Sequence, residues 1–566
     1  MRRHRCSGLV ATLLLFAPGL FAPGLLAQDA SGEDPKSSFF ETLDVNVVNI
    51  EVFVNDKQGN PVTGLTREDF EVFEDGRPVA IQNFYAVADG QPVTLPETDG
   101  SPETPERAAR LHLQEIPEDQ RLHLVVYVDN FNIEPFHRNR VFRQLRAFLR
   151  KLDPRDRVML ISYDRSLNIR QRFTEDPSLV NAALFELEEM TGGRLQANRE
   201  RREILERIDQ AEDGTVMLAR TRQYASSIMT DLRFTLEALR DTVSSVSGLA
   251  GRKAVLYVSD GLPMSPGRDV FFHVQRKYQE MSAILEAQQL DASRDFQTLV
   301  NQANSSGVTF YTIDASGLQS LTAGDAEHAR ASSVEGGGAF ADDMHQDNLQ
   351  SSIQYIAERT GGTAIVNVND IGNLLGRVGA DFKTYYSLGY SPARAGDGRY
   401  HEIEVKVARK GLTVRHRDGY RDKPVSQRMS ERTASSLRHG VQSNPLGVGI
   451  RVGAVSPYDN DNYVVPFLIR IPLDKIVLIP RESVHEGRLQ VYFTAMDEDG
   501  GVAEVQRDQI SIQIPQQELE AARSKFYTYE AKLLMRPGKH LFGAGIHDEL
   551  GAVASFVTTS VAAGPR

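Results

Sequence analysis

The spacing of hydrophobic and polar positions changes twice along the chain. Residues 43–88 alternate apolar and polar side chains with a period of two, and turn residues at Gly59-Asn60-Pro61 and Asp75-Gly76 separate the runs. This pattern predicts short antiparallel strands, which we interpret as a small β-sandwich module. Residues 443–562 return to the same period and predict a C-terminal β-sandwich domain.

Between these regions, apolar runs alternate with amphipathic segments over residues 120–390. Strands that alternate with helices are typical of an α/β fold, so we predict a doubly wound, mostly parallel sheet with helices on both faces. The segment "NIRQRFTED" follows the second strand after only a short turn, which predicts an antiparallel edge strand. Residues 391–423 are expected to add β strands that close this central unit.

One helical stretch is longer than a crossover between parallel strands requires. It spans residues 194–247, and its first half is rich in charged side chains. We therefore expect a helical insertion near residues 194–235 that projects from the sheet and can be shortened without unfolding it.

The N-terminal residues 1–27 contain three arginines, then an apolar stretch, then Ala27, which is the order of a secretory signal peptide. We expect the mature chain to begin close to Gln28 and the protein to be secreted or periplasmic. The alternative is an uncleaved anchor. N-terminal sequencing of exported protein distinguishes the two, and Met1 retained in a membrane fraction would contradict cleavage.

The composition excludes several classes of chemistry. The single cysteine, Cys6, lies inside the predicted signal, so the mature chain has no disulfide, no Cys-ligated zinc and no Cys nucleophile. A formal charge of −12 argues against a general nucleic-acid binder. The chain has no Walker loop, GxSxG, GxGxxG or HExxH motif. After signal cleavage no segment is long and apolar enough to predict a membrane span.

Two carboxylates stand at the ends of apolar runs. Asp129 ends "VVYVD", and Asp260 follows "VLYVS". If these strands are neighbours whose connections leave in opposite directions, their carboxyl ends form the topological switch point, where ligands bind. Thr174, after the predicted edge strand, could approach the same crevice.

The stretches "VVYVDN", "FTED" and "VLYVSDG" occur in the order found in the von Willebrand factor A domain, which residues 120–390 resemble. "EVFVNDKQGNPVTGLTREDFEVFEDGRPVAIQNF" before them and "YYSLGYSP" after them are similar to the flanks of the acidobacterial VWFA-related family. The resemblance implies a metal-ion-dependent adhesion site with the pattern Asp-x-Ser-x-Ser, a threonine and a second aspartate. Its ligands here would be Asp129, Thr174 and Asp260, holding Mg²⁺ or Mn²⁺.

The sequence departs from that pattern at both serines, where it has Phe131 and Ile133. Neither side chain can bind a metal. Asn130 and Asn132 carry carbonyl oxygens, but at the wrong offsets, so only a rearranged loop could use them. We therefore expect a degenerate site with no firmly held cofactor, and Mg²⁺ or Mn²⁺ at low occupancy at most.

The alternative to a metal is that protein groups neutralise the two aspartates. Backbone donors, hydroxyl groups and a nearby cation such as Arg138 or Arg140 would orient Asp129 and Asp260. A pair of buried carboxylates needs some such partner, because charge without compensation is expensive to bury.

These features favour a non-catalytic adhesion or scaffold protein whose central domain binds an unidentified protein partner. Two other functions stay open. The chain could be a structural envelope protein with a vestigial site, or a hydrolase that uses the crevice between Asp129 and Asp260, although no set of nucleophile, base and oxyanion donors is evident.

Overall fold

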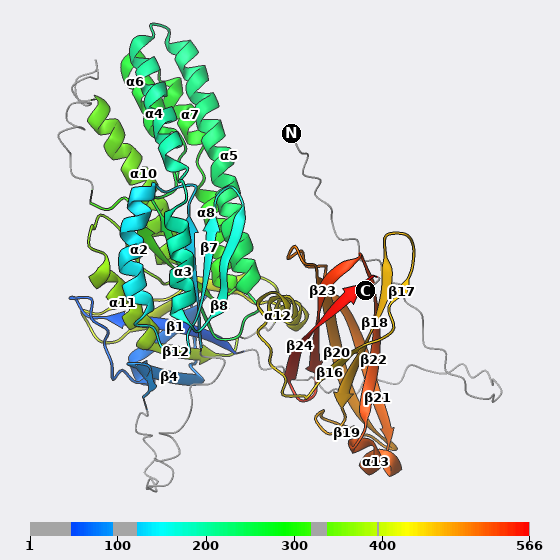
Figure 1. The fold of residues 1–566 in the computed structure, drawn as a ribbon. Helices are drawn as coiled ribbons and strands as arrows, with labels where there is room; N and C mark the ends of the chain where they lie inside the picture. Colours follow the sequence, from blue (N-terminus) through cyan, green and yellow to red (C-terminus); the bar gives the residue numbers. More distant parts are fainter. Residues whose placement is uncertain (1–46, 94–120, 319–336, 393–395, 565–566) are drawn as a thin grey trace, which may run out of the picture. The chain divides into compact units, whose positions relative to one another are not determined.

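The computed structural model describes residues 47–93, 121–318, 337–392 and 396–564. The predicted signal, residues 1–27, lies outside these ranges. The chain divides into two compact units, one spanning Asn46–Pro424 and the other containing Val425–Arg566 (Figure 1). Within the described ranges, no helix has the length and apolar character needed to cross a membrane.

The first unit is built around a six-stranded sheet with the order β11-β10-β9-β6-β7-β8. The strands are β6 (Leu122–Asp129), β7 (Arg157–Tyr163), β8 (Leu167–Thr174), β9 (Arg252–Ser259), β10 (Val308–Asp314) and β11 (Ala364–Ile365). Only β8 is antiparallel to its neighbour. The chain leaves β6 toward β7 on one side and leaves β9 toward β10 on the other. The prediction of an α/β class is confirmed, and the switch point lies between β6 and β9.

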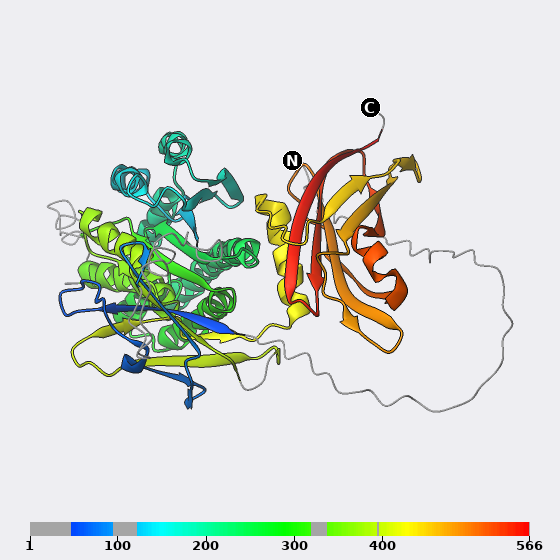
Figure 2. The same ribbon diagram turned by 90° about the horizontal axis from the view of Figure 1, so that it is seen from below.

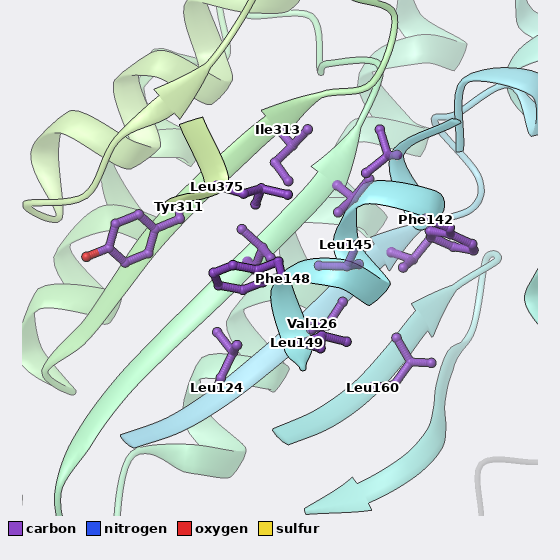
Figure 3. Packing of buried hydrophobic residues seen from close by; sticks show 14 of the residues in the cluster. Leu124, Val126, Phe142, Leu145, Phe148, Leu149, Leu160, Tyr311, Ile313 and Leu375 are labelled. Carbon is purple, nitrogen blue, oxygen red and sulfur yellow. The ribbon is translucent and has the colours of Figure 1, made fainter. Parts of the chain in front are cut away.

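Helices cover both faces of this sheet (Figure 1 and Figure 2). On one face the helices are α2 (Pro135–Leu149), α3 (Pro177–Glu188) and α11 (Gly372–Lys383); α8 (Ser293–Ser305) and α10 (Gly337–Arg359) pack on β10. Every residue of β6 is buried, as expected of a strand covered on both sides. Figure 3 shows Leu145, Phe148 and Leu149 of α2 packed over Leu124 and Val126 of β6.

Four helices extend beyond the ends of the strands and form a helical excursion (Figure 1). They are α4 (Arg194–Gln210), α5 (Gly214–Val246), α6 (Arg268–Tyr278) and α7 (Ser282–Gln289). Ile208, Met217, Phe271 and Ala283 belong to one hydrophobic cluster drawn from all four helices. The expected insertion at residues 194–235 is therefore only part of the excursion, because α6 and α7 come from the later connection between β9 and β10.

A pair of sheets in the first unit combines strands from before and after the α/β sheet. Their orders are β14-β1-β12-β4-β5 and β15-β13-β2-β3. The strands are β1 (Val48–Asn55), β2 (Phe70–Glu74), β3 (Arg77–Val79), β4 (Asn83–Ala88), β5 (Gln91–Pro92), β12 (Tyr385–Tyr390), β13 (Tyr400–Val407), β14 (Thr413–Arg415) and β15 (Gly419–Arg421). Ile50 pairs with Leu388, and Val72 pairs with Val405.

This arrangement corrects two expected boundaries. Residues 43–88 are not a separate module, and residues 391–423 do not close the α/β sheet. Their apolar side chains share one core, in which Ile50, Val72, Leu388 and Val405 are all buried. The physical reason is that the few strands before residue 93 cannot enclose a core, and the returning strands supply the missing pairs. The α/β sheet is thus inserted between β5 and β12.

The second unit has two antiparallel sheets around one hydrophobic core. Its elements are α12 (Val425–His439), β16 (Gly449–Val452), β17 (Ser456–Pro457), β18 (Tyr463–Pro472), β19 (Ile479–Pro480), β20 (Val484–Met496), β21 (Gln506–Pro515), α13 (Leu519–Arg523), β22 (Phe526–Met535), β23 (Gly538–Asp548) and β24 (Val553–Ala563). Helix α12 packs on β20, β23 and β24. Gly545 on β23 lets the helix approach, because a Cβ there would collide with Thr433.

Candidate functional site

Asp129, at the end of β6, is fully buried and held by three donors. The Tyr257 hydroxyl on the neighbouring strand β9 donates to Oδ2 at 2.5 Å. Asn132 donates its backbone N–H to Oδ1 and its Nδ2 to Oδ2, both at 3.0 Å. Burial raises the pKa of Asp129 to about 6, although these hydrogen bonds favour the charged form. Asp129 therefore keeps an oriented place in which both of its oxygens already have donors.

Asp260 follows β9 and is partnered by the start of α2. Its Oδ2 accepts the backbone N–H of Glu134 at 2.8 Å and a hydrogen bond from His137 Nδ1 at 3.0 Å. Burial lowers the pKa of His137, but the hydrogen bond and charge of Asp260, with the charge of Glu134, raise it overall. His137 is thus the side-chain partner of Asp260, and this contact favours its protonated form. Sequence reasoning missed it, although its place in the first helical turn after the Asp129 loop is a usable signal.

The two arginines expected to neutralise the aspartates are hydrogen-bonded to other groups. Arg138 is fully buried and donates to the side-chain oxygen of Asn130, and to the carbonyl oxygens of Glu188 at 3.0 Å and Met190 at 2.8 Å. Arg140 donates to backbone carbonyls after β10. The expectation that either arginine contacts the carboxylates was wrong. Arg138 instead ties the loop after β6 to the end of α3.

Thr174 lies at the opposite end of the sheet from Asp129. It pairs with Val158 near the start of β7, whereas Asp129 pairs with Tyr163 at the end of the same strand. Its hydroxyl accepts the backbone N–H of Asp176 at 3.0 Å. Because β8 runs antiparallel, its last residue returns to the amino ends of the parallel strands. The assignment of Thr174 to the crevice is therefore corrected.

The loop that does reach the crevice is Thr191-Gly192-Gly193. Asn130 donates its Nδ2 to the Thr191 carbonyl at 2.7 Å, and the Gly193 N–H donates to the Asn130 carbonyl at 3.1 Å. A Cβ at Gly193 would lie 2.6 Å from the Phe131 carbonyl oxygen, so glycine is required for this approach. Sequence reasoning passed over this loop, although a Thr-Gly-Gly run before a helix was a visible signal.

The donor set of the crevice does not fit a Mg²⁺ or Mn²⁺ site. Ile133 is fully buried, and the Phe131 ring lies beneath the Arg165 guanidinium at 4.7 Å. Asn132 turns its amide nitrogen toward Asp129. Among the described side chains, no group of three or more His, Cys, Asp or Glu is placed to hold a metal. The buried Oδ1 of Asp260 is without a hydrogen-bond partner, but one free oxygen is far from the roughly six that such a cation prefers.

The raised pKa of Asp129 predicts a specific pH dependence of stability. The folded carboxyl titrates at about 6, whereas an unfolded aspartate titrates near 4. Between these values the folded state binds more protons, so the free energy of unfolding falls as the pH rises, by about 3 kcal/mol at most for this group. Asp129→Asn should remove this fall.

Chemical denaturation at about pH 4 and pH 7 measures the effect in both proteins. Asp156 also has a pKa raised to about 6 by burial and the nearby Asp153, but it is unchanged in the variant, so the difference between the two profiles isolates Asp129. If the free energies of unfolding of the two proteins change equally between these pH values, Asp129 is not the group responsible.

No family model matches the chain, and no curated protein matches it. Solved structures that match include an aerotolerance-related membrane protein from Bacteroides fragilis, at 11% identity over 46% of this chain and 98% of that one, with a TM-score of 0.25. A von Willebrand factor type A protein from Catenulispora acidiphila matches at 8% identity over 78% and 65%, with a TM-score of 0.22. The pilus adhesin SpaC from Lactobacillus rhamnosus GG matches at 9% identity over 90% and 57%, with a TM-score of 0.26.

Proposed function

We propose that this chain is a secreted or periplasmic adhesion or scaffold protein of the acidobacterial VWFA-related type. It binds a protein partner through the crevice at the carboxyl ends of β6 and β9. The observation that carries the proposal is the preorganised loop at the switch point of the sheet. Asp129, Asn132 and Asp260 are each held there by hydrogen bonds, and one buried oxygen of Asp260 has no partner among the described residues.

Binding at this crevice is proposed to be independent of a divalent cation. His137 is hydrogen-bonded to Asp260, and Tyr257 and Asn132 occupy the oxygens of Asp129. A metal ion in this crevice would need the carboxylate oxygens of Asp129 and Asp260 as its protein ligands. In this proposal the crevice lies where an A domain has its binding site, but side chains and not a metal ion set the charge of the crevice.

The chain is proposed to be non-catalytic. The two carboxylates at the crevice serve as hydrogen-bond acceptors for Tyr257, Asn132, His137 and a backbone N–H. His137 and Asp260 form the one pair there that resembles an acid–base couple, and no nucleophile in the described part of the chain is hydrogen-bonded to this histidine. Proximity of a base without a positioned nucleophile does not make a hydrolase.

The test is capture of a saturable partner by the full mature chain, compared between the wild type, Asp260→Asn and Thr174→Ala. Asp260→Asn should weaken capture at least tenfold because it removes the charge that orients His137. Thr174→Ala should bind like the wild type, because Thr174 lies at the other end of the sheet. EDTA should change capture little.

Three outcomes would overturn parts of the proposal. Equal capture by Asp260→Asn and the wild type would indicate a vestigial crevice in a structural protein. Turnover of ester, peptide or glycan substrates that is lost in His137→Ala would indicate a hydrolase. A tight isotherm for Mg²⁺ or Mn²⁺ by titration calorimetry, abolished in both Asp129→Ala and Asp260→Ala, would show that the loop rearranges to recruit Asn130 or Asn132.

A further inference from the structure

A cavity of about 90 Å³ lies beneath the helical excursion, next to the crevice. Its walls come from the loop after β6, from α4 and α5, from the loop between β9 and α6, and from α10. The cavity therefore exists because the excursion covers this part of the carboxyl end of the sheet. Its chemistry is independent of the protein partner proposed above.

The buried cation in its wall is Arg194, the first residue of α4. Its side chain is 8% exposed, and no hydrogen bond or ion pair joins it to any other described residue. It lies within electrostatic reach of Asp129, whose oxygens accept from Tyr257 and Asn132 instead. The guanidinium lines the cavity and no anion is hydrogen-bonded to it among the described side chains, so it is suited to receive a bound acid.

The other charges on the wall have partners of their own. Arg201 donates to Asp269, also in the wall, at 2.6 Å, and His345 Nδ1 lies 3.6 Å from the same carboxylate. Burial lowers the pKa of His345. Asp231 accepts from Arg165 at 3.2 Å. Glu200 is exposed and accepts from Gln196 on the same helix at 2.9 Å. Arg194 is therefore the wall charge left to pair with a ligand.

The start of α4 adds to the positive potential. Gly193 at the N-cap provides no side-chain acceptor, so the first N–H groups of a 17-residue helix are left without a side-chain cap. The positive end of the helix dipole favours an anion at this position.

The rest of the wall is mixed. Polar groups come from Asn132, Asn198, Tyr224, Ser227, His345 and Asn348, and one side is apolar. Leu232 of α5, Leu262 after β9 and Leu349 of α10 are buried and line the cavity together with Ile228 and Pro263. A ligand that matches both walls has an acidic head and a short hydrocarbon body. Phosphate alone would leave the apolar wall uncovered.

We propose that this cavity binds a small organic monocarboxylate. The guanidinium of Arg194 receives the carboxylate, a pairing whose two parallel N–H···O bonds match the planar geometry of both groups. The hydrocarbon part packs against Leu232, Leu262 and Leu349. The cavity is smaller than the roughly 150 Å³ that accommodates benzene, so the ligand has only a few carbons.

The experiment titrates acetate, butyrate and hexanoate into the full mature chain by calorimetry, with butyramide as the neutral counterpart of butyrate. Inorganic phosphate is the second anion. Butyrate should bind saturably and raise the melting temperature, whereas butyramide and phosphate should not. Arg194→Gln should weaken butyrate binding at least tenfold. Arg199→Gln, an exposed arginine of the same helix outside the cavity wall, should bind like the wild type.

The unliganded variants provide a second readout. If Arg194 is a ligand-binding cation without a structural partner, Arg194→Gln should keep or raise the melting temperature, and Arg194→Lys should bind butyrate with intermediate affinity because it cannot form the paired bonds. A marked fall in the melting temperature of both variants would make Arg194 structural and overturn the proposal. So would the absence of saturable binding by all three acids up to about 10 mM, or phosphate binding as tight as that of butyrate.

Discussion

Replacing Arg138 with methionine is expected to destabilise the first unit by about 3–5 kcal/mol, because several buried neutral acceptors lose a charged donor at about 1–3 kcal/mol each. Arg138 is fully buried, and it donates to the Asn130 side chain and to the carbonyls of Glu188 and Met190. Methionine fills similar space but cannot donate to these acceptors, and within the described residues only the Glu188 carbonyl keeps another donor, Asn139 Nδ2 at 3.4 Å. The loop that carries Asp129 should lose its anchor to α3, so capture of the proposed partner should fall as well.

Urea denaturation of the full chain measures this loss, with Arg143→Met as the control. Arg143 is on the same helix and exposed, so its replacement should change the free energy of unfolding by no more than about 0.5 kcal/mol. If the two variants unfold at the same urea concentration, Arg138 does not hold the loop.

Deleting residues 194–235 is expected to abolish cooperative unfolding of the first unit, in contrast to the expectation from sequence. The deletion removes α4 and much of α5, and with them Ile208 and Met217. Val270 and Phe271 of α6 are fully buried against this cluster and would be exposed. An exposed apolar patch of this kind favours aggregation.

A matched deletion that also removes α6 and α7, residues 268–289, takes away both sides of the same core. It should recover a cooperative transition more fully than the shorter deletion, because no unpaired apolar face is left. Thermal unfolding followed by circular dichroism and dye binding compares the two. A sharp transition in the shorter deletion would show that the helices from the two connections are independent.

Much of the α/β sheet could be predicted from local pattern. The apolar runs that end at Asp129 and before Asp260 became β6 and β9, and both carboxylates lie at the switch point between these strands. This was possible because a strand buried on both faces has a continuous apolar signature, and the handedness of its connections limits the topology.

The edge strand that contains Thr174 was predicted correctly, but the place of Thr174 in the sheet was not. The edge strand was predicted antiparallel, and that direction by itself carries the last residue of β8 away from Asp129. The partners His137 and Arg194, by contrast, come from helices whose side-chain direction depends on packing. No local rule identifies which histidine of the chain approaches Asp260 or which arginine is buried without a partner.

By itself, the sequence determined the α/β class, the two aspartates at the end of the sheet, and the presence of Phe131 and Ile133, which cannot bind a metal, in the loop after Asp129. These follow from composition and short-range periodicity, which depend on residues close together in the chain. Only the tertiary structure decided that β1 and β2 pair with strands more than 300 residues later, that four helices from two connections share one core, and that Arg194 faces a cavity. The physical reason is that pairing and burial are properties of surfaces brought together by the fold, and their free energies depend on neighbours that no local pattern specifies.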